Sequence, residues 1–251
     1  MAEYTGTLTA PPYEIPRRMP WGLADMGKAI GLVILLTILF SLPAAFLATV
    51  LAGRSSDLED SPAALTVLLG ISFFLEAFML SCALYFSVGK YRLSLAALGL
   101  RLPRRGSWWL PLVLLGGGMF IMYVYFGILA ASGVHPKSDL PDQVFHNIGP
   151  LTILIVLSVL IAPIVEEIFF RGFIFGGLRG RWGTALAALG SGLLFGLAHL
   201  GNPGTFYIIP PIALVGVLFS LGYAYSGSIL ATIAAHFLFN LISVAVGIAS
   251  S

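Results

Sequence analysis

Two adjacent glutamates and an arginine interrupt one of the most apolar parts of the sequence. Glu166, Glu167 and Arg171 lie inside an apolar stretch that covers about residues 151–175. At the centre of a membrane-spanning helix each charge costs about 2.5–3.5 kcal/mol on insertion scales, so three unpaired charges would oppose insertion of the helix. We therefore expect these groups to be paired, hydrated or functional.

Helical spacing divides the three groups into a pair and a single carboxylate. Glu167 and Arg171 are four residues apart with the acid first, which is the favourable order for an ion pair along one helix face. Glu166 points about 100° away from Glu167, so Arg171 neutralises it less easily. We expect Glu167 to be the structural carboxylate and Glu166 the working one. Pro163 removes a hydrogen bond to Val159 and predicts a kink just before the acids, which could open a polar cavity.

Composition places these charges in a membrane protein. Of the 251 residues, 58% are hydrophobic, 10% are charged and 29 are glycines, which is far too apolar for a soluble domain. The net charge of +2 does not suggest a nucleic-acid partner. Cys82 is the only cysteine, which excludes an intrachain disulfide framework and a cysteine-based metal cage, and we expect it to serve packing.

The apolar runs predict an all-α, polytopic transmembrane helical bundle of about seven spans, or eight if a half-span is present. We interpret residues 1–28 as a cytoplasmic or interfacial N-terminal arm, with Trp21 at the membrane interface, and residues 29–250 as a single transmembrane helical domain. The predicted spans are approximately 29–52, 63–88, 108–132, 151–177, 182–200, 207–226 and 229–248.

Basic residues alternate between rich and poor connections. Three lie in the N-terminal arm, five in the loop after the second span and two in the loop at 179–181, whereas the first and third loops hold one each. By the positive-inside rule the N-terminus is cytoplasmic, and seven spans place the C-terminus outside. The basic segment 92–105, with Trp108 and Trp109 after it, is expected to lie at the cytoplasmic interface.

The fifth predicted span carries a histidine on its face of small residues. Gly192, Gly196 and His199 recur at i, i+4 and i+7, so we expect His199 to point toward the packed interior. Glu166 and His199 each lie about 25 Å along their helices from the turn at 179–183. An antiparallel hairpin would therefore bring them to one level.

The last span carries His236 and Asn240 four residues apart on one face, which points to a shared cavity. Counted from the turn at 226–228, they lie about 12 and 18 Å deep, which matches 25 Å poorly unless a helix is tilted or broken at a proline.

In the first three spans Glu76 is the one ionisable residue, and we expect it to be hydrogen-bonded to neighbouring helices rather than to act as a proton relay or substrate contact. Clustering of polar groups in the later spans indicates an intramembrane polar site.

Three motifs follow one another on successive apolar segments, Glu166-Glu167-x-x-x-Arg171, Phe195-x-x-x-His199 and His236-x-x-x-Asn240. This ordered set resembles the motifs of the CAAX protease and bacteriocin-processing family, which includes prenyl-protein endopeptidases of the ras-converting type and bacterial self-immunity proteins. The resemblance covers roughly residues 161–241, about a third of the chain, and all three motifs are complete.

The resemblance implies a glutamate-dependent intramembrane endopeptidase, with a catalytic core at 149–248. Glu166 would activate the attacking water with help from His199, while His236 and Asn240 would stabilise the oxyanion. The predicted ion pair would hold the helix geometry or share the acid–base work. The chemistry is coherent because a carboxylate in a low-dielectric pocket suits a general base, and amide and imidazole N–H groups suit a developing oxyanion.

Other interpretations stay open from the residues alone. Two histidines and a glutamate could bind Zn²⁺ in a metalloprotease, but HExxH is missing and Asn240 is a poor ligand, so we expect no cofactor. A non-proteolytic membrane scaffold or immunity-type protein would bind a partner without hydrolysing it. A transporter fits less well because the second half of the sequence does not repeat the first. The expected partners are the lipid bilayer and a membrane-associated, in one branch prenylated, protein or peptide, and the expected location is a bacterial plasma membrane, or the endoplasmic reticulum of a eukaryote.

Overall fold

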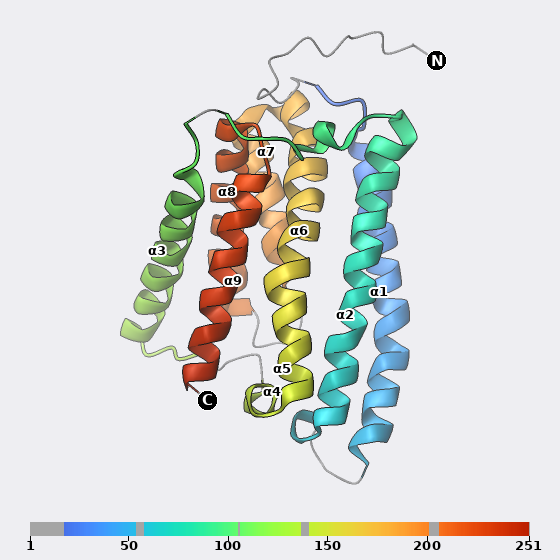
Figure 1. The fold of residues 1–251 in the computed structure, drawn as a ribbon, viewed down its shortest axis with the longest axis vertical. Helices are drawn as coiled ribbons and strands as arrows, with labels where there is room; N and C mark the ends of the chain where they lie inside the picture. Colours follow the sequence, from blue (N-terminus) through green and yellow to red (C-terminus); the bar gives the residue numbers. More distant parts are fainter. Residues whose placement is uncertain (1–17, 54–57, 105, 137–140, 201–205, 251) are drawn as a thin grey trace.

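A computed structural model describes residues 18–53, 58–104, 106–136, 141–200 and 206–250. The described chain is helical, as predicted, and its long helices form one bundle (Figure 1). The long helices are α1 (Leu23–Ala52), α2 (Pro62–Leu84), α3 (Leu110–Ala131), α7 (Gly176–Ala198), α8 (Ile209–Ser226) and α9 (Leu230–Ser250). Shorter helical segments are η1 (Leu58–Asp60), η2 (Tyr85–Gly89), η3 (Leu95–Leu98), α4 (Asp142–His146), α5 (Ile148–Leu154), η4 (Ile155–Ile161), α6 (Ala162–Glu166) and η5 (Glu167–Phe175).

Six helices of the described chain are long and apolar enough to cross a membrane, and the fourth covers 51 residues, Ile148–Ala198. Gly183 divides that helix in two, because its φ of 77° lies outside the helical region and suits glycine. The returning limb packs on η5, where Ser191 Oγ donates a hydrogen bond to Phe170 O at 2.8 Å. With this helix counted as two limbs, the described chain has seven long helical segments, which correspond to the seven predicted spans. The second limb, residues 184–198, is only about 22 Å long.

Helices α7 and α8 approach each other through glycines. A Cβ atom on Gly192 would lie 2.6 Å from Val217 Cγ2 and 2.7 Å from Ala213 O, and one on Gly216 would lie 2.8 Å from Gly192 Cα. Side chains at these positions would push the two helices apart. The predicted packing of the small-residue face is confirmed.

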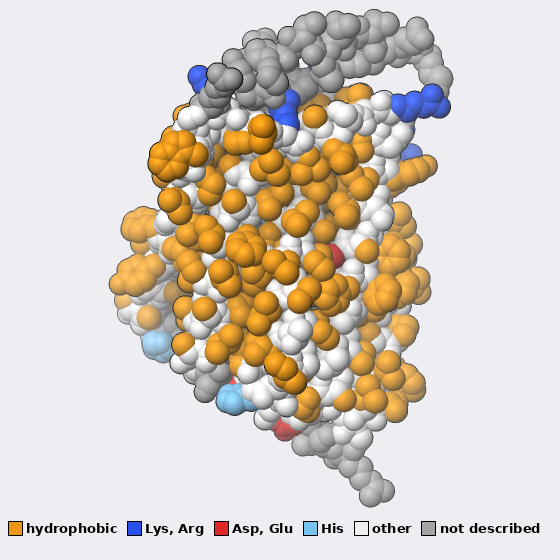
Figure 2. Space-filling model, viewed as in Figure 1, with side chains coloured by type: hydrophobic (Ala, Val, Ile, Leu, Met, Phe, Trp, Pro, Cys, Tyr) orange, Lys and Arg blue, Asp and Glu red, His pale blue; other side chains and the backbone are white. Residues whose placement is uncertain are grey.

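Charge is separated between the two ends of the bundle. Apart from Arg171, the described Lys and Arg residues lie near the end at which the described chain begins, and the opposite end carries Asp142 and His146 (Figure 2). Between the two ends the visible surface is mainly hydrophobic. The described chain begins and ends at opposite ends of the bundle (Figure 1), as expected for an odd number of rods.

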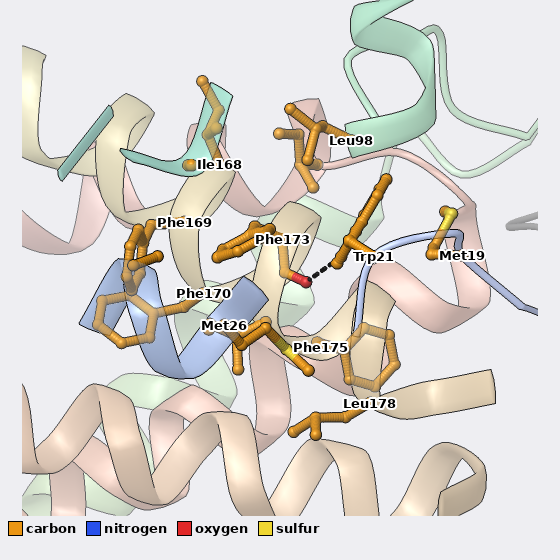
Figure 3. Close-up of a cluster of buried hydrophobic side chains, with 14 of the residues drawn as sticks. Met19, Trp21, Met26, Leu98, Ile168, Phe169, Phe170, Phe173, Phe175 and Leu178 are labelled. Carbon is orange, nitrogen blue, oxygen red and sulfur yellow. Dashed lines mark hydrogen bonds between the residues drawn. The ribbon is translucent and has the colours of Figure 1, made fainter. Parts of the chain in front are cut away.

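The segment before α1 differs from the predicted interfacial arm. Residues 1–17 lie outside the described chain, but α1 begins at Leu23, and both Met19 and Trp21 are buried. Trp21 lies against Phe173 and donates its indole N–H to Phe173 O at 2.9 Å (Figure 3). The expectation of Trp21 at the membrane interface is wrong, because its ring fills the core and its polar atom finds a buried carbonyl.

The basic segment after η2 is also more deeply packed than predicted. Leu98 is fully buried, Arg101 Nε donates to Gly227 O at 2.8 Å, and Ile229 N donates to Gly99 O at 3.0 Å. Leu102 remains exposed. The segment therefore covers the turn between α8 and α9 in addition to facing the surroundings.

Candidate active site

The helix that carries the two glutamates contains wide, π-helical turns. Segments η4 and η5 are π-helical, and the short α6 with Pro163 lies between them. A π-helical turn would pair the amide of residue 163 with the carbonyl of residue 158, but proline has no N–H to donate. The carbonyl of Ser158 instead accepts a hydrogen bond from Asn240 Nδ2 at 2.7 Å. The backbone hydrogen bond that Pro163 cannot make is thus replaced by one from Asn240, which links α9 to the π-helical turns.

Glu167 and Arg171 form the ion pair that their spacing predicts. Arg171 Nη1 lies 2.8 Å from Glu167 Oε1, and neither side chain is exposed. Arg171 Nη2 donates to Gly216 O at 3.4 Å, and the guanidinium lies 4.3 Å from the centre of the Phe195 ring. Burial of the arginine is thus compensated by a carboxylate, a carbonyl and an aromatic face.

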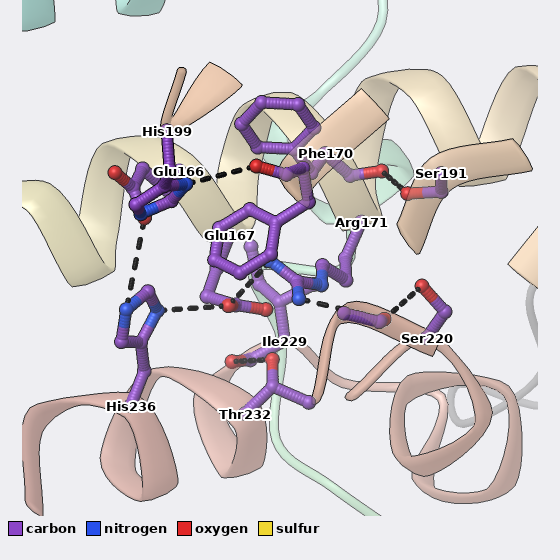
Figure 4. A network of polar contacts seen from close by, with 12 residues as sticks. Glu166, Glu167, Phe170, Arg171, Ser191, His199, Ser220, Ile229, Thr232 and His236 are labelled. Atoms are coloured by element: carbon purple, nitrogen blue, oxygen red, sulfur yellow. Dashed lines mark hydrogen bonds and ion pairs between the residues drawn. The ribbon is translucent and has the colours of Figure 1, made fainter. Parts of the chain in front are cut away.

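His236 lies between the two glutamates (Figure 4). Its Nδ1 is 3.1 Å from Glu167 Oε1 and its Nε2 is 3.6 Å from Glu166 Oε2. A neutral imidazole has one N–H and one acceptor nitrogen, so an Nδ1–H that donates to Glu167 leaves Nε2 to accept, whereas an imidazolium donates on both sides. The ring therefore couples the ion-paired carboxylate to Glu166, whose side chain is 14% exposed.

The contact between His236 and Glu166 resolves the depth mismatch expected from the sequence. The nine residues of η5 are π-helical, so the chain advances less per residue than the α-helical count assumed. The turn that precedes α9 also lies beneath the segment at 99–104, so α9 starts deeper in the bundle. Both differences bring His236 to the level of Glu166.

His199 and Asn240 complete the set of predicted site residues. His199 Nδ1 pairs with Phe195 O at 2.9 Å, which leaves Nε2 available. His199, His236 and Asn240 line one pocket of about 50 Å³. One N–H of the Asn240 amide is taken by Ser158, and the other remains for a ligand. The structure thus brings His199, His236 and Asn240 together in one small pocket whose other walls are apolar or aromatic side chains.

A larger cavity of about 520 Å³ lies on the other side of Glu166. Its walls come from α1, α2, α6, η5 and α7, and they include Glu166 together with Ala198 and Leu200, the neighbours of His199. His199 shares the small pocket with His236, whose Nε2 is 3.6 Å from Glu166, so Glu166 and His199 lie at similar depth, as the hairpin count predicts. Figure 2 shows an acidic side chain at mid-height of the hydrophobic face, so an acidic group reaches the surface of the bundle between its two ends.

Glu76 on α2 lines the same cavity as Glu166. The sequence marked it only as a lone acid, for which hydrogen bonding to neighbouring helices was expected. Its Oε2 is buried and has no hydrogen-bond partner among the described residues, so that expectation is wrong for this atom. A lone acid in an apolar span was the signal in the sequence that could have marked Glu76 as a site residue. That Glu76 faces the cavity of Glu166 follows only from the packing of α2.

The described residues include no group of three or more His, Cys, Asp or Glu side chains arranged to hold a metal ion. Glu166, Glu167 and His236 come close together, but Glu167 is already engaged by Arg171. The cofactor prediction stays a prediction.

Comparison with protein families agrees with this geometry. Residues 148–242 match the family model of Rce1-like type II CAAX prenyl endopeptidases. The resemblance predicted from the three motifs is confirmed over this segment. The Rce1-like segment contains the six predicted site residues, Glu166, Glu167, Arg171, His199, His236 and Asn240, whereas Glu76 lies outside it.

Three bacterial proteins are similar to parts of the chain. One from Mycoplasma capricolum is 37% identical over 40% of this chain and 29% of its own length. The Bacillus subtilis protein named "Putative membrane peptidase YdiL" is 29% identical over 43% of each chain, and an Escherichia coli protein is 31% identical over 48% of this chain and 57% of its own. The chain thus spans between 29% and 57% of these relatives. No solved structure matches.

Proposed function

We propose that the protein is an intramembrane endopeptidase that hydrolyses a peptide bond of a membrane-associated protein or peptide. The observation that carries this proposal is the position of Glu166. Its carboxylate lies between His236, at 3.6 Å, and a cavity of about 520 Å³ inside an apolar bundle. The match of residues 148–242 to the Rce1-like family supports the same reaction class.

In the proposed reaction Glu166 is the general base. It takes a proton from a water molecule as the water oxygen attacks the carbonyl carbon, and it returns that proton to the leaving nitrogen as the C–N bond breaks. His199, whose Nε2 is available, holds the water from the second side. Such general acid–base catalysis contributes about 10²–10⁴ in rate.

The small pocket is the proposed site of the oxyanion. The donors are the second N–H of Asn240, whose first N–H is held by Ser158, and the Nε2–H that His236 carries in its imidazolium form, in which Nδ1–H is held by Glu167. Donors fixed in this way need no reorganisation when charge develops on the substrate oxygen. Glu167 and Arg171 hold the His236 ring in place through the contact at 3.1 Å.

The large cavity is the proposed binding site for the apolar part of the substrate. Its volume lies within the range of about 300–1,000 Å³ that is usual for small-ligand sites. Most of its walls are aliphatic or aromatic side chains from α1, α2 and α7. A prenyl chain on the substrate would fit between these walls, and the name of the matching family, a prenyl endopeptidase, suggests such a substrate.

The test is cleavage of a quenched fluorescent peptide by the detergent-purified chain. We expect cleavage of the peptide that ends in a prenylated cysteine motif, weaker cleavage of the same peptide without the prenyl group, and no effect of a metal chelator. Loss of cleavage with chelator would instead identify a zinc-dependent protease. Binding of the prenylated peptide without cleavage would favour the scaffold alternative.

We also propose that the basic end of the bundle faces the cytoplasm. Two exposed positions at opposite ends test this, Leu102 and Ile148, whose side chains are 81% and 83% exposed. In a Cys82→Ala background, a membrane-impermeant maleimide added to intact cells should label Ile148→Cys at once and Leu102→Cys only after permeabilisation. The reverse pattern would overturn the orientation.

A further inference from the structure

Glu76 is a carboxyl group that the proposed reaction has not used. It lies in the middle of α2 and lines the cavity of about 520 Å³ together with Glu166. Helix α2 packs on both α6 and η5, so the two acids come from facing elements. The buried Oε2 of Glu76 has no hydrogen-bond partner among the described residues.

No described basic side chain lines this cavity to neutralise the two acids. Arg171, the cation nearest to Glu166 in the sequence, is held by Glu167 and by the carbonyl of Gly216. His236 faces Glu166 from the side of the small pocket. The remaining walls of the large cavity that are not apolar are the hydroxyls of Thr37 and Ser72, which carry no charge.

Two ionised carboxylates in such a cavity would repel each other and would also lose hydration. One shared proton removes both costs, because a protonated carboxyl donates a hydrogen bond to an ionised one, directly or through a water. Of the two acids, Glu166 has a histidine nitrogen at 3.6 Å, which donates to an ionised Glu166 when the ring is an imidazolium. Glu76 has no such partner among the described residues, so the proton belongs on Glu76.

We propose that Glu76 is a positioning residue that holds one proton across the cavity from Glu166 and donates it in a hydrogen bond toward Glu166 or the water between them. The proposal rests on the hydrolytic function proposed above. Glu76 keeps its proton throughout the reaction, in which the water proton moves to Glu166 and then to the leaving nitrogen. Its role is to fix the orientation of the Glu166 carboxylate and of the attacking water.

Two substitutions separate a hydrogen-bond donor from simple packing. Glu76→Gln keeps the shape and a donating N–H, whereas Glu76→Leu removes the donor and fills the same space with an apolar group. Asp142→Asn, the same acid-to-amide change at an exposed position of α4, is the matched control. Thermal unfolding of each purified variant checks that the fold is retained.

The first measurement does not depend on catalysis. Infrared absorption of the purified full chain at neutral pH should show the carbonyl stretch of a protonated carboxyl. We expect Glu76→Gln to abolish that band, Glu166→Gln to shift it, and Asp142→Asn to leave it unchanged. A band that persists unchanged in Glu76→Gln, or that is missing from the wild type, would overturn the shared proton.

The second measurement is cleavage of the quenched prenylated peptide. We expect Glu76→Leu to lower kcat by about 10- to 100-fold with KM changed less than threefold, and Glu76→Gln to recover at least half of that loss on a logarithmic scale. Equal kcat values for wild type and Glu76→Leu would overturn the positioning role while leaving the proposed hydrolysis intact. A wild type without peptidase activity would overturn both the hydrolysis and the positioning role, and the infrared band would then decide the shared proton alone.

Discussion

Removal of Arg171 tests whether the buried ion pair holds the site together. In Arg171→Met the apolar stem is roughly conserved, but the fully buried Glu167 loses its arginine counter-charge at 2.8 Å and keeps only the contact with His236 at 3.1 Å. Breaking a buried pair from one side costs about 3–5 kcal/mol, because a charge is left without compensation. The lost contact with the Phe195 ring adds to this cost.

The double variant Glu167→Gln/Arg171→Met separates the loss of charge pairing from the loss of packing. With both charges removed, no buried ion remains unpaired, and replacement of a buried pair by neutral groups is often nearly neutral for stability. We therefore expect the double variant to recover most of the loss and the coupling energy to be at least about 2 kcal/mol.

The assay is unfolding of the purified protein by increasing sodium dodecyl sulfate in mild detergent, followed by circular dichroism. Arg179→Met is the matched control, since Arg179 is only partly buried and its Nε donates to a hydroxyl, Thr184 Oγ1, at 3.2 Å. We expect the control to cost less than about 1 kcal/mol. The reasoning fails if Arg171→Met is as stable as the control, or if the double variant is destabilised by the sum of its two single changes.

Three further variants test the packing and anchoring of the site by the same unfolding assay. Trp21→Phe should destabilise by about 1–3 kcal/mol because a buried carbonyl loses its donor, and no loss would show that the hydrogen bond is dispensable. Gly192→Val should lower the free energy of unfolding by about 1–3 kcal/mol or more, because a Cβ would lie 2.6 Å from Val217. Gly116→Val should be tolerated, because nothing lies within 4 Å of a Cβ at that position. Asn240→Ala should cost about 1 kcal/mol in stability and lower kcat by about 10²-fold or more, and unchanged kcat would exclude Asn240 from the oxyanion site.

Local spacing was enough to predict several features of the site. The ion pair of Glu167 and Arg171 follows from their i,i+4 relation, because both residues lie on one rigid helix. The packing of the Gly192 face follows from a periodicity of small residues in an apolar run. The family match over 148–242 follows from the ordered motifs, since their spacing survives independently of how the helices are tilted.

Features that depend on packing between distant segments were not predictable in this way. Trp21 precedes an apolar run, which is the usual place of an interfacial tryptophan, and only the space beside Phe173 makes it a core residue. Glu76 lies outside the motifs, and the rotation of α2 decides whether it faces lipid or Glu166. The depth of His236 depends on π-helical turns, which no residue pattern specified.

Comparison of Glu166→Gln with the wild type in the peptide assay tests the central proposal most directly. The amide keeps the shape of the side chain but cannot accept a proton from water, so we predict a loss of about 10²–10⁴ in kcat with the unfolding transition unchanged. Asp142→Asn, the same kind of change at an exposed position, should cleave as the wild type does. Wild-type cleavage by folded Glu166→Gln would contradict the assignment of Glu166 as the base and, with it, the proposed mechanism.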